Sequence, residues 1–372
     1  MKNVLICVDS VFQFIIASNL RATLYNEDEV DLVIYNSYSN ANKMYENIKN
    51  KGYFRNVYFA DTPLTYCGNK YTYMQKLPKY FIYGVSLIAP KKVLRNIIKT
   101  NLDNSYDNFI FNGDGALPEC IFNACLKKNR QLKCYRIEDG YFSYMKEFGK
   151  EKSAGRFKFE RIMHSIFGTQ NIREYIEGYY MSEPDLAQIK FPYSLICIPK
   201  FSRDNKALVT FLNDAFGYDV AQNEQFFRKN IYFEDGASFF EGGDEELEIM
   251  KEIVKYIPKD TILVKRHPRR KEDRFAPMEI KCCTVNGVPW EVIQLNCSMD
   301  GNCLISSCSS TVFNSAIFFD DDCKRVLTYR LMKQPPFVVR DPNFEKFINA
   351  FKGKYGDASI VCPRNYEELA SI

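Results

Sequence analysis

The chain has 372 residues, of which 46% are hydrophobic and 26% charged, so its composition is that of an ordinary globular protein and excludes a disordered or fibrous one. This length exceeds one ordinary hydrophobic core and predicts two domains of roughly 150–200 residues each. The formal net charge of +4, from 50 basic and 46 acidic residues, is too balanced for a dedicated nucleic-acid-binding protein, and we expect no nucleic-acid partner.

Cysteine usage and the first residues predict a cytoplasmic protein. The 13 cysteines are an odd number, and several lie in apolar runs, as buried reduced thiols do. No stretch reaches the about 18 uncharged apolar residues of a transmembrane helix. The first apolar run ends at Asp9, which is too early for a secretory signal and is typical of a first strand. No C-x-x-C pair occurs, and we expect neither a metal nor a cofactor.

The first half alternates short β-branched or aromatic runs with amphipathic segments of helical length, which is typical of βαβ units and a parallel sheet. The predicted strands are Val4–Val8, Asp31–Tyr35, Asn56–Ala60, Asn108–Asn112 and Lys133–Ile137. The predicted helices are Val11–Leu24, Ala41–Lys49, Lys91–Lys99 and Pro118–Lys128. Residues 1–185 are therefore a predicted Rossmann-like domain. Its end, about Gly155–Pro192, is mixed, with a helical segment at Phe157–Phe167, the breakers Gly168 and Gly178, and prolines suited to a linker.

The second half, residues 190–372, repeats the alternation. The predicted strands are Leu195–Pro199, Asn230–Phe233, Thr261–Lys265, Asn302–Ser306 and Arg325–Thr328. The predicted helices are Asp244–Tyr256, Pro289–Leu295, Thr311–Phe318, Asn343–Phe351 and Tyr366–Ile372. The expected fold is α/β, with two Rossmann-like domains facing a central cleft. Because open α/β sheets bind ligands at the carboxyl ends of their strands, the polar residues that follow these strands are the candidates for function.

An acidic turn follows the predicted strand Lys133–Ile137. Glu138 and Asp139 precede Gly140 there, which places at least one carboxylate on a tight turn at the cleft rim. Such a carboxylate can accept a proton from an attacking hydroxyl if burial or a neighbouring charge raises its pKa toward neutrality. A plain Asp-Gly turn is the alternative.

A basic turn follows the predicted strand Thr261–Lys265. His267, one of only two histidines, is held at the strand tip by Pro268, because the residue before a proline prefers an extended conformation. Together with Lys265 and Arg269 it suits a phosphate, whose charge the cations complement. A basic surface turn is the alternative. The other histidine, His164, lies in the amphipathic segment Phe157–Phe167, and we expect it to be structural or on the surface.

Hydroxyl side chains follow the predicted strand Asn302–Ser306. Five of the six positions from Ser306 to Thr311 carry a hydroxyl, more than one helix N-cap needs, which favours an anion site. Two further acidic segments are weaker candidates, and a third is read as a surface turn. Glu234-Asp235-Gly236 repeats the acidic turn in the second half, Asp114 follows the strand Asn108–Asn112, and Asp320–Asp322 is expected to be a solvated acidic turn.

In this order, Glu138-Asp139-Gly140, His267-Pro268 and Ser309-Ser310-Thr311 resemble the motif set of bacterial sialyltransferases with the glycosyltransferase-B fold, of the lipooligosaccharide and capsule type. Each motif has two or three residues, and the specificity of the likeness comes from their order. The resemblance implies an acceptor-side N-terminal domain and a donor-side C-terminal domain. It also implies inverting, metal-independent transfer of sialic acid from CMP-sialic acid to a sugar hydroxyl of a glycan or glycolipid, either lipooligosaccharide or capsule.

The resemblance also implies roles for single residues. Asp139 is the implied general base on the acceptor hydroxyl, and His267 binds the CMP phosphate and assists its departure. The other implied donor-side residues are Lys265, Pro268, Ser309, Ser310, Thr311 and Gly236. The other implied acceptor-side residues are Glu138, Gly140 and Asp114. Because Glu-Asp-Gly occurs twice, Asp235 is the alternative base.

Several alternatives stay open at this point. The motifs also allow a transferase of the same fold with Kdo or glucose as donor sugar, or a non-catalytic protein that binds a nucleotide or phosphosugar. Tyr66–Tyr83 and Tyr175–Tyr180 are candidate sugar-stacking surfaces. A glycolipid acceptor would suit peripheral contact with the inner membrane through the basic segment Lys146–Lys158, for which a solvated loop is the alternative. The oligomeric state is open, with a homodimer among the options.

Overall fold

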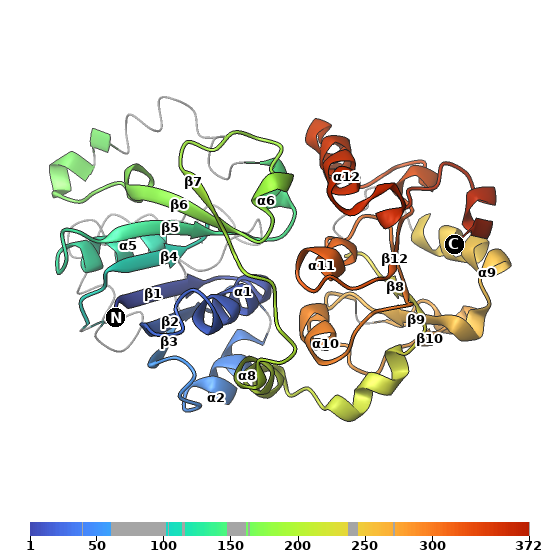
Figure 1. The fold of residues 1–372 in the computed structure, drawn as a ribbon, viewed down its shortest axis with the longest axis horizontal. Helices are drawn as coiled ribbons and strands as arrows, with labels where there is room; N and C mark the ends of the chain where they lie inside the picture. The colour runs from blue at the N-terminus through green and yellow to red at the C-terminus, as the bar shows by residue number, and fades with distance from the viewer. Residues whose placement is uncertain are drawn as a thin grey trace, which may run out of the picture. The chain divides into compact units, whose positions relative to one another are not determined.

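The computed structural model describes residues 1–38, 40–60, 102, 104–113, 116–146, 161–162, 164–236, 245–270 and 272–371. The chain divides into two compact units, each built around one parallel sheet (Figure 1). The first unit comprises Met1–Pro184, Ile189–Pro199 and Thr210–Ala215. The second comprises Asp185–Gln188, Lys200–Val209 and Phe216–Ile372. The predicted helix Lys91–Lys99, the aromatic segment Tyr66–Tyr83, Asp114 and most of Lys146–Lys158 lie outside the described residues.

The first unit has a seven-stranded sheet with the order β3-β2-β1-β4-β5-β6-β7, and every pairing is parallel. The strands are β1 (Asn3–Val8), β2 (Glu29–Tyr35), β3 (Asn56–Ala60), β4 (Asn108–Phe111), β5 (Lys133–Ile137), β6 (Ile176–Met181) and β7 (Ser194–Cys197). The buried strands are mainly apolar on both faces, as a parallel sheet covered by helices requires, and Asp31 and Asn108 are the buried polar residues in β2 and β4.

Helices of the first unit bury both faces of its sheet. They are α1 (Val11–Ala22), α2 (Ala41–Ile48), α5 (Ala116–Leu126), the short α6 (Phe142–Met145) and α8 (Lys206–Phe216). Helix α1 begins where the Ser10 hydroxyl accepts the Gln13 amide at 3.2 Å, which satisfies one of the open N–H groups of the first turn. Its Phe14 contacts Phe211 of α8, with ring centroids 5.9 Å apart. The apolar side of α5 packs in a separate core cluster with side chains of β1, β2, β4 and β5.

Two strands of the first sheet differ from the prediction. The segment expected to start the second half, Leu195–Pro199, forms β7 and pairs with β6 of the first sheet, so its assignment to the second half was wrong. Strand β6 occupies the segment expected to be a linker. Gly178, which was expected to break the structure, lies inside β6. A glycine is needed at this position because a Cβ there would lie only 2.9 Å from Ile196 Cδ1. Tyr179 and Tyr180 are buried core residues and not a sugar-stacking surface.

The second unit has a five-stranded parallel sheet with the order β10-β9-β8-β11-β12. The strands are β8 (Asn230–Phe233), β9 (Ile262–Lys265), β10 (Lys281–Cys282), β11 (Cys303–Ser306) and β12 (Lys324–Leu327). The helices are α9 (Glu245–Tyr256), α10 (Trp290–Asn296), α11 (Thr311–Ile317) and α12 (Pro342–Tyr355), and the end of the chain forms a short 3₁₀ helix at Glu367–Ser371. The predicted strands and helices of this half are otherwise present with boundaries shifted by a few residues.

Helices also cover both faces of the second sheet. The apolar stripe of α9 packs in a core cluster with side chains of β8, β9 and β11. On α10, Trp290 packs edge-on against Phe233 of β8 at 4.7 Å between ring centroids. Phe313 of α11 meets Phe347 of α12 at 5.1 Å. These contacts fix the strand ends from which the polar residues project.

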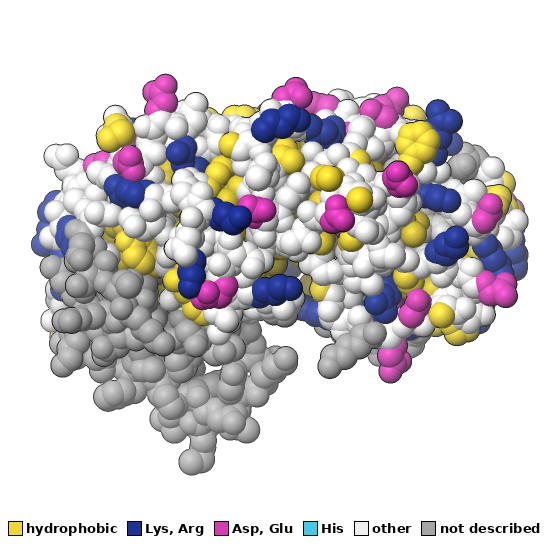
Figure 2. All heavy atoms as spheres, turned by 90° about the horizontal axis from the view of Figure 1, so that it is seen from below, with side chains coloured by type: hydrophobic (Ala, Val, Ile, Leu, Met, Phe, Trp, Pro, Cys, Tyr) yellow, Lys and Arg dark blue, Asp and Glu magenta, His cyan; other side chains and the backbone are white. Residues whose placement is uncertain are grey.

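The cysteines, the helices and the surface charges of the described residues are typical of an ordinary globular protein. The cysteines that the structure describes are all free thiols. No helix in the described ranges has the length and apolar character needed to cross a bilayer. On the face drawn in Figure 2, basic and acidic side chains are interspersed, and no continuous area of one sign covers the described surface.

Candidate functional site

The polar residues of the second half lie at the carboxyl edge of its sheet. In the ladder, Phe233 of β8 pairs with Lys265 of β9 on one side and with Ser306 of β11 on the other. The next residues of the three strands therefore begin side by side. The acidic turn, the basic turn and the hydroxyl loop, separate in sequence, meet at one edge of one sheet, as parallel topology requires.

His267 sits in a tight turn directly after β9. The Arg270 amide donates to the His267 carbonyl oxygen at 2.9 Å, with Pro268 and Arg269 as the two central residues. Proline suits the first central position because its φ is already fixed near the value that the turn needs. The His267 amide donates to Oε2 of Glu234 at 3.1 Å. Pro268 and Glu234 thus hold the backbone of His267 at the strand end.

The imidazole of His267 has a defined protonation state. Its Nδ1 accepts the Arg269 amide at 3.1 Å, so the neutral ring carries its proton on Nε2. Burial lowers the pKa of His267 to about 4, and the charges of Arg269, Arg270 and Lys265 act in the same direction. The ring is therefore neutral near pH 7 and presents Nε2–H as a hydrogen-bond donor. An anion placed against it would raise its pKa again.

A buried ion network lies beneath this turn. Arg274 donates to Glu234 through Nε at 2.8 Å and to Glu246 of α9 at 2.5 Å. Glu246 also accepts the amide of Asp235 at 2.9 Å. Burial, and then repulsion by Asp235, raises the pKa of Glu246. One arginine thus joins the end of β8 to α9, and Glu234 is an anchor with no side-chain oxygen left open toward a ligand.

Asp235 and the hydroxyl loop are joined to each other. Ser306 Oγ donates to Asp235 Oδ1 at 3.4 Å and accepts the Ser309 amide at 3.0 Å. Asp235 is 4% exposed, and burial raises its pKa. Ser309 Oγ donates to Thr311 Oγ1 at 3.0 Å. Ser309, Ser310 and Thr311 are half-exposed, so the loop offers hydroxyls at the edge while Ser306 and Asp235 hold it from below.

Two other residues of this edge have distinct places. Lys265 is 7% exposed, and its ammonium donates to the carbonyl oxygens of Val285 at 3.0 Å and Asn286 at 3.3 Å. Its charge is therefore held by the loop that precedes α10, and burial lowers its pKa. Gly236 completes the acidic turn as the last described residue before position 245.

The first unit has an equivalent acidic turn after β5. Glu138 is fully buried and accepts hydrogen bonds from Tyr144 Oη at 2.7 Å and from the amide and hydroxyl of Ser182, which follows β6. Burial raises its pKa to about 7. Glu138 thus fixes the turn to the neighbouring strand end, as Glu234 does in the second unit. Gly140 has φ +73°, a conformation that favours glycine.

Asp139 is mostly buried, with part of its surface exposed, and faces the end of β1. Its Oδ1 accepts the Ser10 hydroxyl at 2.9 Å, and its amide donates to Ser143 Oγ at 2.8 Å. Burial raises the pKa of Asp139, against the hydrogen bonds from Ser10 and Gln13. A carboxylate with a raised pKa and partial exposure can accept a proton. Asp139 therefore differs from Asp235, which is enclosed.

Asp9 is a candidate residue that sequence reasoning missed. It follows β1 directly, and burial followed by the charge of Asp139 raises its pKa to about 6. Its amide donates to Gln13 Oε1 at 3.0 Å. Its Oδ2 would lie 3.4 Å from a Cβ at Gly113, which has φ +77° and is the second residue after the end of β4. Its place directly after the first strand, followed by a serine, was the available signal.

Asp9 and Asp139 form a carboxyl pair in which the charge of Asp139 raises the pKa of Asp9. Within the described residues, no lysine or arginine contributes to the pKa shift of either group. The pair follows the first and third of three adjacent strands, β1, β4 and β5, and Gly113 follows the middle one. Two such carboxyls resist simultaneous ionisation, so one proton is retained more readily than by either group alone.

The remaining predicted residues lie elsewhere. His164 is buried, with Nδ1 2.9 Å from Thr169 Oγ1 and Nε2 3.0 Å from Glu119 Oε1, so it belongs to the interior. Asp320–Asp322 is only partly solvated, because Asp321 is buried in a salt bridge with Arg203 at 2.7 Å. Over the ranges that the structure covers, no three His, Cys, Asp or Glu side chains gather as a metal-ligand set.

No protein-family model and no curated protein sequence matches this chain. Solved structures are similar in fold. Arabidopsis thaliana UGT89C1 complexed with UDP has a TM-score of 0.50 and 10% identity, over 100% of this chain and 90% of that chain. S. aureus MnaA with UDP has a TM-score of 0.49 and 10% identity, over 100% and 86%. The calicheamicin glycosyltransferase CalG4 has a TM-score of 0.48 and 11% identity, over 100% and 90%. The fold is α/β with two Rossmann-like domains, the glycosyltransferase-B fold.

Proposed function

We propose that the chain is a glycosyltransferase that moves a sugar from a nucleotide donor to a hydroxyl of an acceptor glycan. The observation that carries the proposal is the carboxyl edge of the second sheet, where neutral His267 and the Ser309–Thr311 hydroxyls follow β9 and β11 on either side of β8. This edge supplies uncharged donors for phosphate oxygens, with Arg269 and Arg270 as nearby cations. The fold is compatible with this reaction but does not select it, because one fold serves many functions, and the proposal therefore rests on the site.

In the proposed reaction, an acceptor hydroxyl attacks the anomeric carbon of the donor sugar. The new carbon–oxygen bond forms as the bond between that carbon and the phosphate oxygen breaks, with inversion of configuration. The hydroxyl proton passes to Asp139, and the nucleotide leaves with the bonding electron pair. Nε2–H of His267 and the hydroxyls of Ser309 and Ser310 donate hydrogen bonds to the departing phosphate, whose charge increases in the transition state.

We assign the base to Asp139 and not to Asp235. Asp139 is partly exposed, while Asp235 is 4% exposed and holds the hydroxyl loop through Ser306. Burial raises the pKa of Asp139, which suits a group that must accept a proton near neutral pH. In this proposal Lys265 acts at a distance, because its ammonium is bound to two loop carbonyls.

For the donor we propose CMP-sialic acid, with the sugar hydroxyl of a surface glycan as acceptor. The support is the order of the Glu-Asp-Gly, His-Pro and Ser-Ser motifs, of which the last two lie at one sheet edge of the second unit. The test is a thermal-shift series with CMP, UDP, GDP and ADP, followed by incubation with CMP-sialic acid and lactose. Stabilisation by CMP and formation of sialyllactose are expected. Stabilisation by UDP alone would mean that the donor is a UDP-sugar and not CMP-sialic acid. If no nucleotide stabilises the protein, the proposal that it is a glycosyltransferase is wrong.

A further inference from the structure

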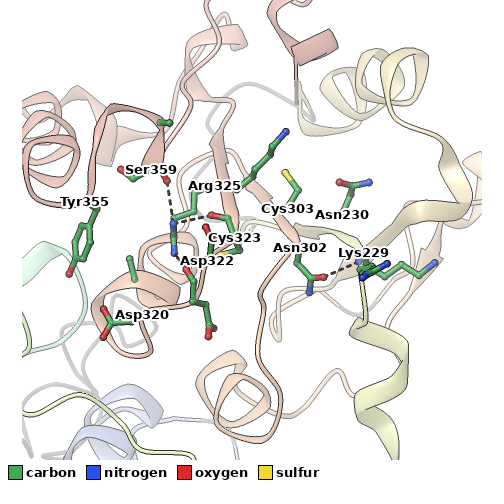
Figure 3. Close-up of a pocket in the computed structure, with 16 residues that line it drawn as sticks. Lys229, Asn230, Asn302, Cys303, Asp320, Asp322, Cys323, Arg325, Tyr355 and Ser359 are labelled. Carbon is green, nitrogen blue, oxygen red and sulfur yellow. Dashed lines mark hydrogen bonds between the residues drawn. The ribbon is translucent and has the colours of Figure 1, made fainter.

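The second unit has a hollow at the edge of its sheet opposite to His267. It has a volume of about 770 Å³ and is bordered by the amino ends of β8, β11 and β12 and by the end of α12 (Figure 3). That volume lies within the range of small-molecule sites, about 300–1,000 Å³. Its lining includes the polar and aromatic side chains of Lys229, Asn230, Asp320, Asp322, Lys324 and Tyr355. None of the predicted donor-side residues lines this hollow.

One wall of the hollow is fixed by buried charges that are already bound. Arg325 is 5% exposed and donates to Ser315 Oγ at 2.7 Å and to the carbonyl oxygens of Asp321 at 2.7 Å and Cys323 at 3.0 Å. The Asp321 carboxylate is held by Arg203. These groups cannot turn toward a ligand without leaving a buried charge unpaired, so they shape the hollow and do not bind its occupant.

Other side chains of the hollow are open to a ligand. Lys324 and Asp322 are exposed, and no hydrogen bond or ion pair engages either side chain in the described part of the chain. Asn230 uses Nδ2 on Thr261 Oγ1 at 2.9 Å, which leaves Oδ1 as an acceptor. At the other end, Tyr355 lies near Asp320 (Figure 3). The Asp320 carboxylate is paired with Lys200, whose ammonium is 5.6 Å from the Tyr355 ring centroid, so Asp320 is not open in this way.

We propose that this hollow is a carbohydrate-binding site that takes an oligosaccharide free of phosphate groups. A sugar hydroxyl donates and accepts at once, and the hollow presents acceptors at Asp322 and Asn230 beside the donor Lys324. The Lys229 ammonium already donates to the Asp260 carbonyl oxygen at 2.9 Å, and an ammonium has two further N–H groups to offer. The half-buried ring of Tyr355 gives an apolar surface against which the C–H face of a sugar packs. The inference goes beyond glycosyl transfer, because the site lies away from the reacting edge and needs no donor.

The same lining argues against other occupants. The carboxylate of Asp322 beside Lys324 disfavours the closely spaced phosphates of a nucleic acid or polyphosphate, while Asp320 is already paired with Lys200. A lipid chain needs a continuous apolar lining, whereas the charged and amide side chains of Lys229, Asn230 and Lys324 interrupt it. An uncharged polyhydroxylated chain is the class that uses both signs of the lining.

The test is saturation-transfer NMR and calorimetry on the full chain, without any nucleotide. The probes are lacto-N-neotetraose, maltotetraose and chitotetraose, with inorganic phosphate and a single-stranded DNA 12-mer as anionic probes. The double variant Asp322→Ala/Lys324→Ala is compared with Glu248→Ala/Lys251→Ala, an exposed acid–base pair on α9 that lies outside the hollow. The conservative variant Asp322→Asn tests the carboxylate without changing the size of the side chain.

We expect at least one oligosaccharide to bind in wild type, the α9 double variant and His267→Ala alike, with at least tenfold weaker binding in Asp322→Ala/Lys324→Ala. No oligosaccharide binding, equal binding in the two double variants, or loss of binding in His267→Ala would each overturn the proposal. Tighter binding of phosphate or DNA to the hollow would also overturn it. If His267→Ala still binds the oligosaccharide, the hollow is separate from the site of glycosyl transfer. If the proposed transferase function is wrong, the oligosaccharide binding expected here is unchanged.

Discussion

The hydroxyl of Ser10 donates a hydrogen bond to Oδ1 of Asp139 over 2.9 Å, although the two residues are 129 positions apart. Ser10 caps α1 and follows Asp9, so this one bond connects the end of β1 to the acidic turn after β5. It brings the carboxyls of Asp9 and Asp139 close enough for the charge of Asp139 to raise the pKa of Asp9. Among the described residues, no cation contributes to the pKa shift of either group. The proposed proton acceptor is thus positioned by a residue that no motif contains.

Asp139→Asn removes the proposed base while keeping the size of the side chain. We expect turnover to fall roughly 10²–10⁴-fold, as for loss of a positioned acid–base group, with little change in nucleotide binding. Asp235→Asn should instead lower thermal stability or donor affinity, because Asp235 holds the hydroxyl loop. Rates of transfer and nucleotide affinities measured on both variants distinguish the roles. Full turnover in Asp139→Asn with loss in Asp235→Asn would reverse the assignment.

Asp139→Asn also tests the carboxyl pair through the titration of Asp9. Removing the Asp139 charge takes away one cause that raises the pKa of Asp9, so the pKa of Asp9 measured by NMR should fall below about 6. Gln13→Leu is a second variant, which removes a hydrogen bond that lowers the pKa of Asp9 and should raise that pKa. An unchanged pKa of Asp9 in Asp139→Asn would show that the two carboxyls do not titrate together.

Asp9→Asn has an expected effect on the pH dependence of stability. The pKa of Asp9 is raised in the folded chain from 3.8 to about 6, so its contribution to stability is full below pH 3.8 and is lost as pH rises through about 6. Asparagine never ionises. The Tm of Asp9→Asn relative to wild type should therefore increase between pH 4 and pH 8, as followed by calorimetry. A constant difference across this interval would contradict the raised pKa.

His267→Gln and His267→Ala separate a neutral donor from a charged acid. Gln offers an N–H near the position of Nε2–H, so we expect it to keep more nucleotide affinity at pH 7 than Ala does. Loss of one such hydrogen bond costs about 1–3 kcal/mol, roughly 5- to 150-fold in the dissociation constant. NMR of the free protein should show a neutral His267 with its proton on Nε2 down to about pH 5. A ring that is protonated at pH 6.5 without ligand would rule this out.

Arg274→Met breaks the buried network under the basic turn. It leaves Glu234 and Glu246 without their shared cation, and we expect a loss of about 3–5 kcal/mol in the free energy of unfolding. The loss should be larger at pH 8.5 than at pH 5.5, because protonation relieves the uncompensated carboxyls and burial already raises the pKa of Glu246. Lys251→Met, which removes an exposed pair with Glu248, is the control and should change the free energy by less than about 1 kcal/mol. Equal losses in the free energy of unfolding for Arg274→Met and Lys251→Met would show that the buried network does not stabilise the fold.

Much of the fold could be predicted because it depends on short-range patterns. Strands β3, β5 and β8 have the bounds that β-branched and aromatic runs predict. The turn at His267 depends on Pro268, the adjacent residue, which fixes φ wherever the chain folds. Strand β6 was missed because Gly178 and two prolines suggested a linker, whereas close packing against β7 is what requires that glycine. A local pattern does not reveal this contact.

The sequence by itself determined which side chains follow which strands, because turn and strand preferences act over a few residues. Only the tertiary structure decided how those side chains are used. It made Glu138 and Glu234 buried anchors and left Asp139 partly open, and it placed Asp9 within reach of Asp139's charge. It also set the protonation of His267 through burial and three nearby cations. Strand order and burial arise from packing between distant segments, and pKa values follow from burial and from charges brought together by that packing.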